Sequence, residues 1–277
     1  MSISASDVKK LRDITGAGMM DCKKALSESG GDMDAAIEFL RKKGQKVADK
    51  RADREAKQGI VVTYISDDNQ KAVALELNCE TDFVARNEEF VENAEAFAKI
   101  AYENQQDDVA ALKELEYNGG ISIGKQLETL IGKIGEKIDI SRVVLMETEG
   151  QIVNYIHPGN QLAVLVDFEG ELKDDEIGKD VAMQVAAMAP IATKRDEVDT
   201  SVLDKEREIA KQQLINEGRP EHIAEKAAEG KLRRFFEERV LLEQKFVKDG
   251  SVSVSEYLKQ QGAPSVRTFK RLQLGEN

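Results

Sequence analysis

The sequence is poor in cysteine and histidine, the residues on which zinc sites, redox pairs and histidine-based catalysis depend. Among its 277 residues there are only two cysteines, Cys22 and Cys79, which form neither a CxxC pair nor a zinc-binding pattern. We interpret both as small apolar residues of a reducing compartment. The two histidines, His157 and His222, do not lie at metal-ligand spacing from a cysteine or from each other. The residues therefore predict neither a metal ion nor a histidine-based catalytic triad.

Long apolar runs are also missing. No segment is long and apolar enough to span a bilayer, and the first residues lack the basic stretch and apolar run of a secretory signal. We therefore expect a cytoplasmic protein that does not enter a membrane. Lys and Arg total 40 against 52 Asp and Glu, a net charge of −12. This charge argues against direct, sequence-independent binding to nucleic acid and favours a protein as the partner.

The first part of the chain predicts a bundle of three short helices over residues 5 to 44. Ser6 is the expected cap of the first helix and Asp32 that of the third, and glycines separate the helices. The charged stretch from Gln45 to Gln58 has little to bury and predicts a solvated, helical linker. The expected apolar faces consist of Val8, Leu11, Ile14, Met19, Cys22, Ala25, Leu26, Ala36, Phe39 and Leu40.

Beyond Gly59 the sequence repeats itself with a constant offset of 91 residues. The matching segments are 62–65 with 153–156 and 72–77 with 163–168. Within each copy the two segments flank turn-forming residues and predict a β-hairpin. A helix and a further strand (138–147 or 266–274) follow each hairpin. The fold class expected is therefore α+β, with a duplicated core of two three-stranded antiparallel sheets and helices packed on one face of each.

The second copy carries an insertion. Residues 199 to 217 predict a charged helix, Gly218 to Pro220 break it, and a second helix begins at Glu221. These helices predict a projecting hairpin at about 190–228. Its weak apolar stripe either folds back on the hairpin, which is the simpler interpretation, or forms a self-association surface; the stripe consists of Val202, Ile209 and Leu214. The expected domains are 1–55, 56–147 and 148–277, the last including the hairpin.

One glycine-rich segment imitates a phosphate-binding loop. Residues 119 to 125 match that pattern as far as Lys125, but Gln126 stands where a Ser or Thr must hold magnesium. The apolar residues from Ile123 to Ile134 instead continue as an amphipathic helix. We therefore expect no bound nucleotide or other cofactor.

The loop after the second strand distinguishes the two copies. The first copy has an aromatic residue there, Phe83, within the run from Asn78 to Asn87. The simpler interpretation packs Phe83 under its own sheet, with Thr81 or Asp82 as a helix cap. The alternative is an exposed apolar wedge. His157, at the turn of the second hairpin, is most simply a solvated residue, although polar recognition residues often lie at such turns.

Two long motifs now suggest a family. The run from Val8 to Leu26 (VKKLRDITGAGMMDCKKAL) and the run from Cys79 to Arg86 (CETDFVAR) resemble, in this order, the two signatures of the elongation factor Ts family. Shorter likenesses are Lys133–Ile138, Tyr155–His157 and Phe246–Asp249. The resemblance therefore extends over essentially the whole chain.

The resemblance implies a ubiquitin-associated-like three-helix domain, then the duplicated core and its inserted hairpin. It implies a guanine-nucleotide exchange factor, not an enzyme, that binds elongation factor Tu·GDP, dislocates its magnesium and promotes GDP release during translation elongation. A homodimer within a larger complex is compatible with the family. The implied magnesium-dislocating residues are Thr81, Asp82, Phe83 and Val84, and the implied partner contacts are Arg12, Met19, Met20, Lys23 and His157.

Two other functions compete with this one. The first is a non-catalytic adaptor whose three-helix domain and charged hairpin recruit other proteins without affecting nucleotide exchange. The second is an enzyme that uses the incomplete glycine-lysine loop around Lys125. Direct binding of ATP or GTP would favour the enzyme, and an unchanged rate of GDP release would favour the adaptor.

Overall fold

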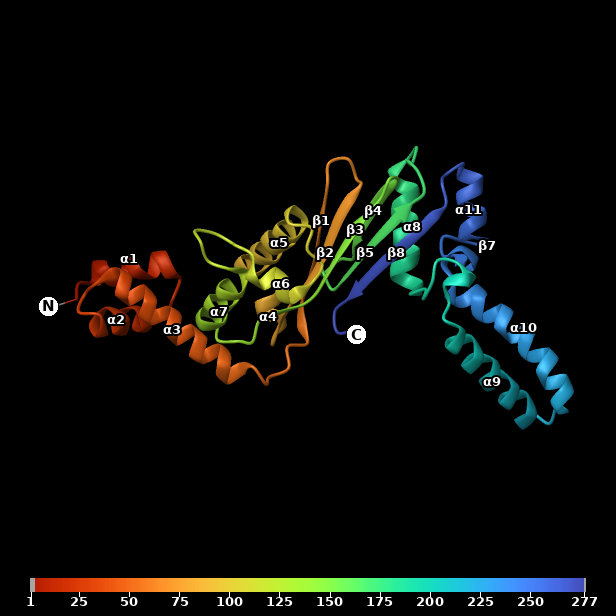
Figure 1. Cartoon of the computed structure of the whole chain (residues 1–277), viewed down its shortest axis with the longest axis horizontal. Coiled ribbons are helices and arrows are strands. Elements are labelled where there is room, and N and C mark those ends of the chain that lie inside the picture. Colours follow the sequence, from red (N-terminus) through yellow and green to blue (C-terminus); the bar gives the residue numbers. More distant parts are fainter. Residues whose placement is uncertain (1–2, 277) are drawn as a thin grey trace.

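A computed structural model describes residues 3–276, with a helical unit at the N-terminal end, paired sheets in the middle and a helical hairpin at the other end (Figure 1). The N-terminal helices are α1 (Ala5–Thr15), α2 (Met19–Glu28) and α3 (Met33–Arg51). Asp32 caps α3 as expected, since its carboxylate accepts the Ala35 amide at 2.8 Å. The expected cap of α1 was wrong. Ser4 caps it in a reciprocal capping box with Asp7, because Ser6 already lies within the first helical turn.

The core of this unit is smaller than the sequence predicted. Ile14 and Met19 were expected inside, but their side chains are 55% and 56% exposed. Three short helices enclose too little volume to cover such wide apolar stripes. The residues that are buried are Val8, Leu11, Cys22, Ala25, Leu26 and Ala36.

The linker interpretation was wrong in part. Residues 45 to 58 are helical only as far as Arg51, and Val47 and Ala48 pack against the core of the first copy. The last turns of α3 therefore join the N-terminal unit to the rest of the molecule.

The duplicated sheets are confirmed. The first sheet consists of β1 (Gln58–Ile65), β2 (Lys71–Cys79) and β3 (Asp139–Glu147), and the second of β4 (Gln151–Ile156), β5 (Leu162–Phe168) and β8 (Val266–Gln273). Both are antiparallel. Tyr64 pairs with Val73, and Tyr155 pairs with Val164 at the corresponding place. Because alternation of apolar residues fixes the register, sequence repetition reproduces it pair by pair.

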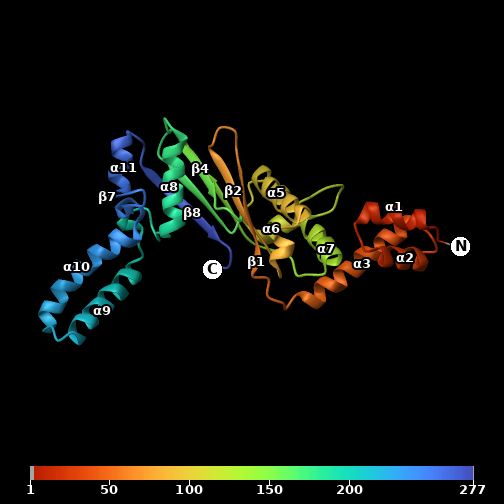
Figure 2. The same ribbon diagram turned by 180° about the vertical axis from the view of Figure 1, so that it is seen from behind.

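The two sheets pack face to face, and helices cover their outer faces (Figures 1 and 2). The interface between the sheets consists of Val61, Ala72, Ala74, Met146, Ile152, Ala163, Leu165 and Leu272. Two equivalent hydrogen bonds cross it: the Val61 amide donates to the Asn160 carbonyl at 2.6 Å, and the Ile152 amide donates to the Asn69 carbonyl at 2.7 Å. The copies are therefore related by a local two-fold arrangement.

The helices and remaining strands lie in chain order around these sheets. The first copy has α4 (Asp82–Ala85), α5 (Glu88–Glu103), α6 (Val109–Glu114) and α7 (Ile123–Ile134). The second copy has α8 (Asp175–Met188), α11 (Val254–Gln261) and the short strands β6 (Lys245–Phe246) and β7 (Asp249–Ser253). Within residues 3–276, no helix has the length and apolar character needed to cross a membrane.

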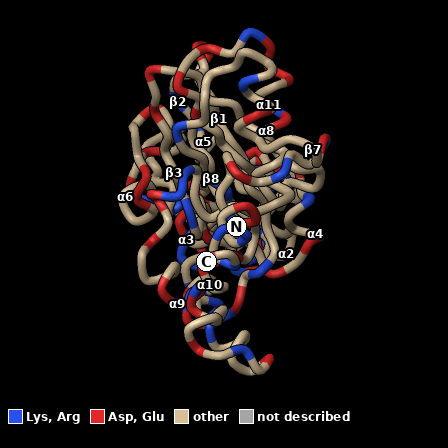
Figure 3. Tube along the Cα trace, turned by 90° about the vertical axis from the view of Figure 1, so that its right-hand side faces the viewer, with Lys and Arg blue, Asp and Glu red and all other residues tan. Residues whose placement is uncertain are grey.

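The inserted hairpin consists of α9 (Thr200–Asn216) and α10 (Glu221–Arg239). The expected limits of about 190–228 were wrong at both ends. Ala192 and Val198 are buried before α9, and α10 continues because Leu232 still packs inward. Basic and acidic residues are interspersed along both helices of the hairpin (Figure 3). Lys211 of α9 forms ion pairs with Glu221 and Glu225 of α10, both at 2.9 Å.

Only part of the apolar stripe folds back on the hairpin. Leu214 is buried between the helices, whereas Val202 and Ile209 are 36% and 41% exposed. The hairpin therefore closes mainly through small residues and Leu214, together with ion pairs between its helices.

Candidate functional site

The most conspicuous apolar side chain on the surface is Phe83, which is 82% exposed. It lies in α4, a single helical turn directly after β2. The simpler expectation, that Phe83 packs under its own sheet, was wrong. Val84 and Ala85 supply the inward contacts of this turn, and one short turn cannot direct three consecutive side chains into the same core.

The turn that carries Phe83 is held by Thr81. The Thr81 hydroxyl accepts the Val84 amide at 3.4 Å, so the expected threonine cap is confirmed. Glu136 accepts two hydrogen bonds from Thr81, one from its hydroxyl at 2.8 Å and one from its amide at 3.0 Å. At the other end, Arg86 pairs with Asp82 at 2.9 Å. Side-chain and main-chain contacts thus hold both ends of the turn.

Cys79, the last residue of β2, contacts the start of this turn. Its thiol donates to the Thr81 carbonyl at 3.1 Å. Burial, with a smaller effect from the nearby Glu136 carboxylate, raises the pKa of the Cys79 thiol to about 12. The thiol therefore stays protonated and inert, which agrees with its interpretation as a small apolar residue.

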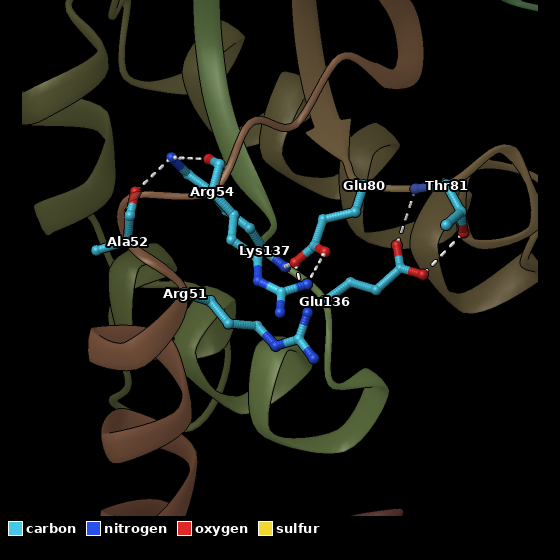
Figure 4. A network of polar contacts seen from close by, with 7 residues as sticks. All are labelled: Arg51, Ala52, Arg54, Glu80, Thr81, Glu136 and Lys137. Carbon is cyan, nitrogen blue, oxygen red and sulfur yellow. Dashed lines mark hydrogen bonds and ion pairs between the residues drawn. The ribbon is translucent and has the colours of Figure 1, made fainter.

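Glu80 connects the segment to the end of α3 (Figure 4). Its carboxylate accepts hydrogen bonds from Arg51 at 2.7 Å, from Arg54 at 3.0 Å and from the Lys137 amide at 2.6 Å. The Lys137 ammonium group in turn donates to the carbonyls of Ala52 at 2.7 Å and Arg54 at 2.9 Å. We call this network, together with Glu136, the brace.

The brace fixes the charge of Glu80. Burial by itself would raise the pKa of this carboxyl, but the hydrogen bonds from the Lys137 amide, Arg51 and Arg54 outweigh it and lower the pKa to about 2. Glu80 therefore stays ionised throughout the physiological pH range.

Replacing Glu80 with glutamine is expected to lower the free energy of unfolding by about 1.5–3 kcal/mol at neutral pH, because three hydrogen bonds lose their charged acceptor. The pKa of Glu80 is lower in the folded chain than its ordinary value of 4.5, so its contribution is complete above that value. As the pH falls from about 4.5 to about 2, the contribution is lost, and the variant and the parent should converge.

Urea unfolding at a series of pH values measures this difference. Glu55→Gln provides the control, since the Glu55 side chain is 74% exposed and pairs only with Lys57. A difference between Glu80→Gln and the parent that is the same at pH 7 and pH 3 would contradict the assignment.

The residues expected to contact a partner through the N-terminal unit lie on its surface. Met20 is 75% exposed and Met19 56% exposed, and Arg12 and Lys23 are exposed on α1 and α2. This group is at one end of the molecule, whereas α4 lies beside the first sheet nearer the middle, as Figures 1 and 2 both show. The structure therefore does not bring it together with Phe83.

His157 lies in the exposed turn between β4 and β5, where its Nδ1 is 2.9 Å from the Tyr155 hydroxyl. The Asn160 carbonyl of the same turn accepts the Val61 amide near the start of β1. The start of β1 pairs with the end of β2, which leads directly into α4. His157 and Phe83 therefore lie at the same end of the paired sheets.

Comparison with known proteins decides the family. Residues 80–276 match the family model described as Elongation factor TS. The chain is 48% identical over 284 residues to the Elongation factor Ts of Prosthecochloris aestuarii, and the match covers 99% of both chains. The chain belongs to the elongation factor Ts family. It is 46% identical to the Elongation factor Ts of Chlorobaculum tepidum and 47% identical to that of Christiangramia forsetii, again over 99% of each chain.

As a member of the elongation factor Ts family, the protein is a translation elongation factor.

Its glycine-rich segment begins a helix: Ser122 caps α7 by accepting the Lys125 amide at 3.3 Å, and the Lys125 ammonium pairs with Glu128 at 2.8 Å. Across the described residues 3–276, no group of three or more His, Cys, Asp or Glu side chains is arranged to hold a metal ion.

Sequence reasoning missed the residues that support this elongation factor Ts site. Glu80, Glu136 and Lys137 were not proposed for any role, because their partners lie far away along the chain. The run from Lys133 to Ile138 was nevertheless one of the motifs that resemble the family. That likeness was the signal that the loop after α7 is important.

Proposed function

We propose that this protein is a guanine-nucleotide exchange factor that binds elongation factor Tu·GDP, dislocates its magnesium ion and promotes GDP release. It acts by binding and forms no covalent bond, so it is not an enzyme in the chemical sense. The observation that carries the proposal is the 82% exposure of Phe83 on a turn that the brace holds. An exposed aromatic side chain on a supported turn is suited to enter a partner's pocket.

The expected action on magnesium follows from its coordination chemistry. Mg²⁺ demands near-ideal octahedral geometry, so a displacement of its ligands by a fraction of an ångström weakens its coordination. In our proposal Thr81, Asp82, Phe83 and Val84 make this displacement, with Phe83 as the intruding side chain. Burial of one phenylalanine contributes about 1.5–3 kcal/mol, and ~1.4 kcal/mol corresponds to a tenfold change in affinity.

Phe83 therefore needs support from a wider interface. We propose that His157 contacts the partner at the Phe83 end of the sheets and that the N-terminal unit contacts it separately, through Arg12, Met19, Met20 and Lys23. The distance between these groups implies a long contact along the molecule. The cytoplasm, where translation takes place, is the proposed location.

The proposal also predicts reciprocal coupling. If this protein weakens the binding of Mg²⁺·GDP to elongation factor Tu, then Mg²⁺·GDP must weaken the binding of this protein by the same factor. Titration calorimetry with nucleotide-free and with Mg²⁺·GDP-saturated elongation factor Tu is expected to show dissociation constants that differ by at least about tenfold. Equal constants would favour the adaptor, which recruits proteins without affecting exchange.

A further inference from the structure

We propose that Glu136 is a positioning residue that holds Phe83 in the orientation needed to enter the partner. This inference rests on the proposed exchange function and extends it to a residue that does not itself reach the partner's nucleotide. Glu136 lies in the loop after α7, 55 residues from Thr81 along the chain, yet its carboxylate holds the residue that caps the Phe83 turn.

The carboxylate acts through the geometry of the threonine hydroxyl. The hydroxyl hydrogen of Thr81 points to Glu136 at 2.8 Å, which leaves an oxygen lone pair to accept the amide of Val84. Val84 directly follows Phe83. A second bond, from the Thr81 amide to Glu136 at 3.0 Å, fixes the main chain at the start of the same turn. Glu136 therefore determines both the direction of the cap and the place where the turn begins.

Glu136 is itself held from both sides. Before it, Gly135 ends α7 with φ of 82°, a left-handed conformation that glycine adopts without steric cost. After it, the Lys137 amide donates to Glu80, and the Lys137 ammonium donates to two carbonyls beyond α3. The loop therefore cannot shift without breaking contacts to Glu80, directly after β2, and to the residues that follow α3 (Figure 4).

The support that Glu136 gives to Phe83 should affect the release of GDP from the complex more than the formation of the complex. A side chain that is mobile before binding must be ordered when it enters its pocket, and this ordering opposes the displacement that it makes. The other proposed contacts, on the N-terminal unit and at His157, do not depend on Glu136. Loss of Glu136 should therefore lower the maximal rate of GDP release at saturation and leave the concentration for half-maximal effect nearly unchanged.

Stopped-flow release of fluorescent GDP from elongation factor Tu tests this with the full chain. Glu136→Ala is expected to lower the maximal rate about tenfold with less than about a twofold change in the half-maximal concentration. Glu136→Gln, which keeps one acceptor oxygen, should give an intermediate rate. Glu128→Ala is the matched control, because Glu128 is also half-buried, in the preceding helix α7, but pairs only with Lys125. Unchanged rates for Glu136→Ala would overturn the proposal.

A double variant separates positioning from an independent effect. If Glu136 acts through Phe83, adding Glu136→Ala to Phe83→Ala should change the rate by less than about twofold. Two reductions that multiply would show that Glu136 acts elsewhere and would overturn the proposal.

Hydrogen exchange of the free protein distinguishes failure of the inference from failure of the proposed function. Glu136→Ala should speed amide exchange at residues 81 to 86 and Glu128→Ala should not. This result does not depend on the partner. Unchanged protection at residues 81 to 86 would overturn the positioning role even if the parent protein accelerates GDP release, whereas an inactive parent protein would overturn the exchange function.

Discussion

Replacing Phe83 with alanine is expected to lower the maximal rate at which this protein releases GDP from elongation factor Tu by about tenfold to roughly a hundredfold. The reason is the loss of the phenylalanine side chain. Its burial in the partner stabilises, by about 1.5–3 kcal/mol, the state in which the magnesium ion is displaced. The stability of the folded protein should be unaffected, because Phe83 is 82% exposed. The release rate and the melting temperature of the variant are the two measurements.

Ile223→Ala is a suitable control for this experiment. Ile223 is also an exposed apolar residue, at 42%, but it lies on α10, in the hairpin on the other side of the paired sheets from α4. Its replacement should leave the maximal rate of release unchanged. If Phe83→Ala releases GDP as fast as the parent protein, the wedge role of Phe83 is wrong, even where the exchange function itself holds.

Replacing Gly132 with alanine is expected to destabilise the contact between α3 and α7 by about 1–3 kcal/mol. The two helices cross at Gly44 and Gly132, and a Cβ atom at Gly132 would lie 2.6 Å from the Gly44 Cα. Since the obstructing atom belongs to the main chain, the helices must move apart. The N-terminal unit, which joins the core through α3, should then be held less firmly.

Gly230→Ala is the matched control for Gly132→Ala. Gly230 is also helical, in α10, but an added Cβ would meet no atom within 4 Å. Alanine should stabilise that helix by up to about 1 kcal/mol, so the two substitutions should shift thermal unfolding in opposite directions. A Gly132→Ala variant at least as stable as the parent would contradict the close crossing of α3 and α7.

The sheets were predictable from the sequence, because hairpin pairing is local and the repeat supplied a second copy of each pattern. Tyr64 and Tyr155 occupy equivalent register positions for that reason. The limits of the hairpin were predicted less well. Its helices bury mainly alanines, such as Ala224 and Ala228, and small residues give a weak apolar pattern that does not define where the helix ends.

The candidate site was predictable only in part. The run around Phe83 was identified by resemblance, but its exposure could not be derived, since hydrophobicity does not determine which side of a single helical turn faces the core. The brace was missed because Arg51, Glu80 and Glu136 come from distant parts of the chain. Contacts of that kind depend on how α3, β2 and α7 pack together, which no local pattern encodes.

This protein is proposed to accelerate nucleotide release from elongation factor Tu. The most direct test is to measure the release of fluorescent GDP from elongation factor Tu·GDP in stopped flow at increasing concentrations of this protein. The proposed function predicts a release rate that rises well above the spontaneous rate and reaches a plateau. A rate that stays at the spontaneous value, with a partner that still releases GDP when its magnesium is chelated, would contradict it.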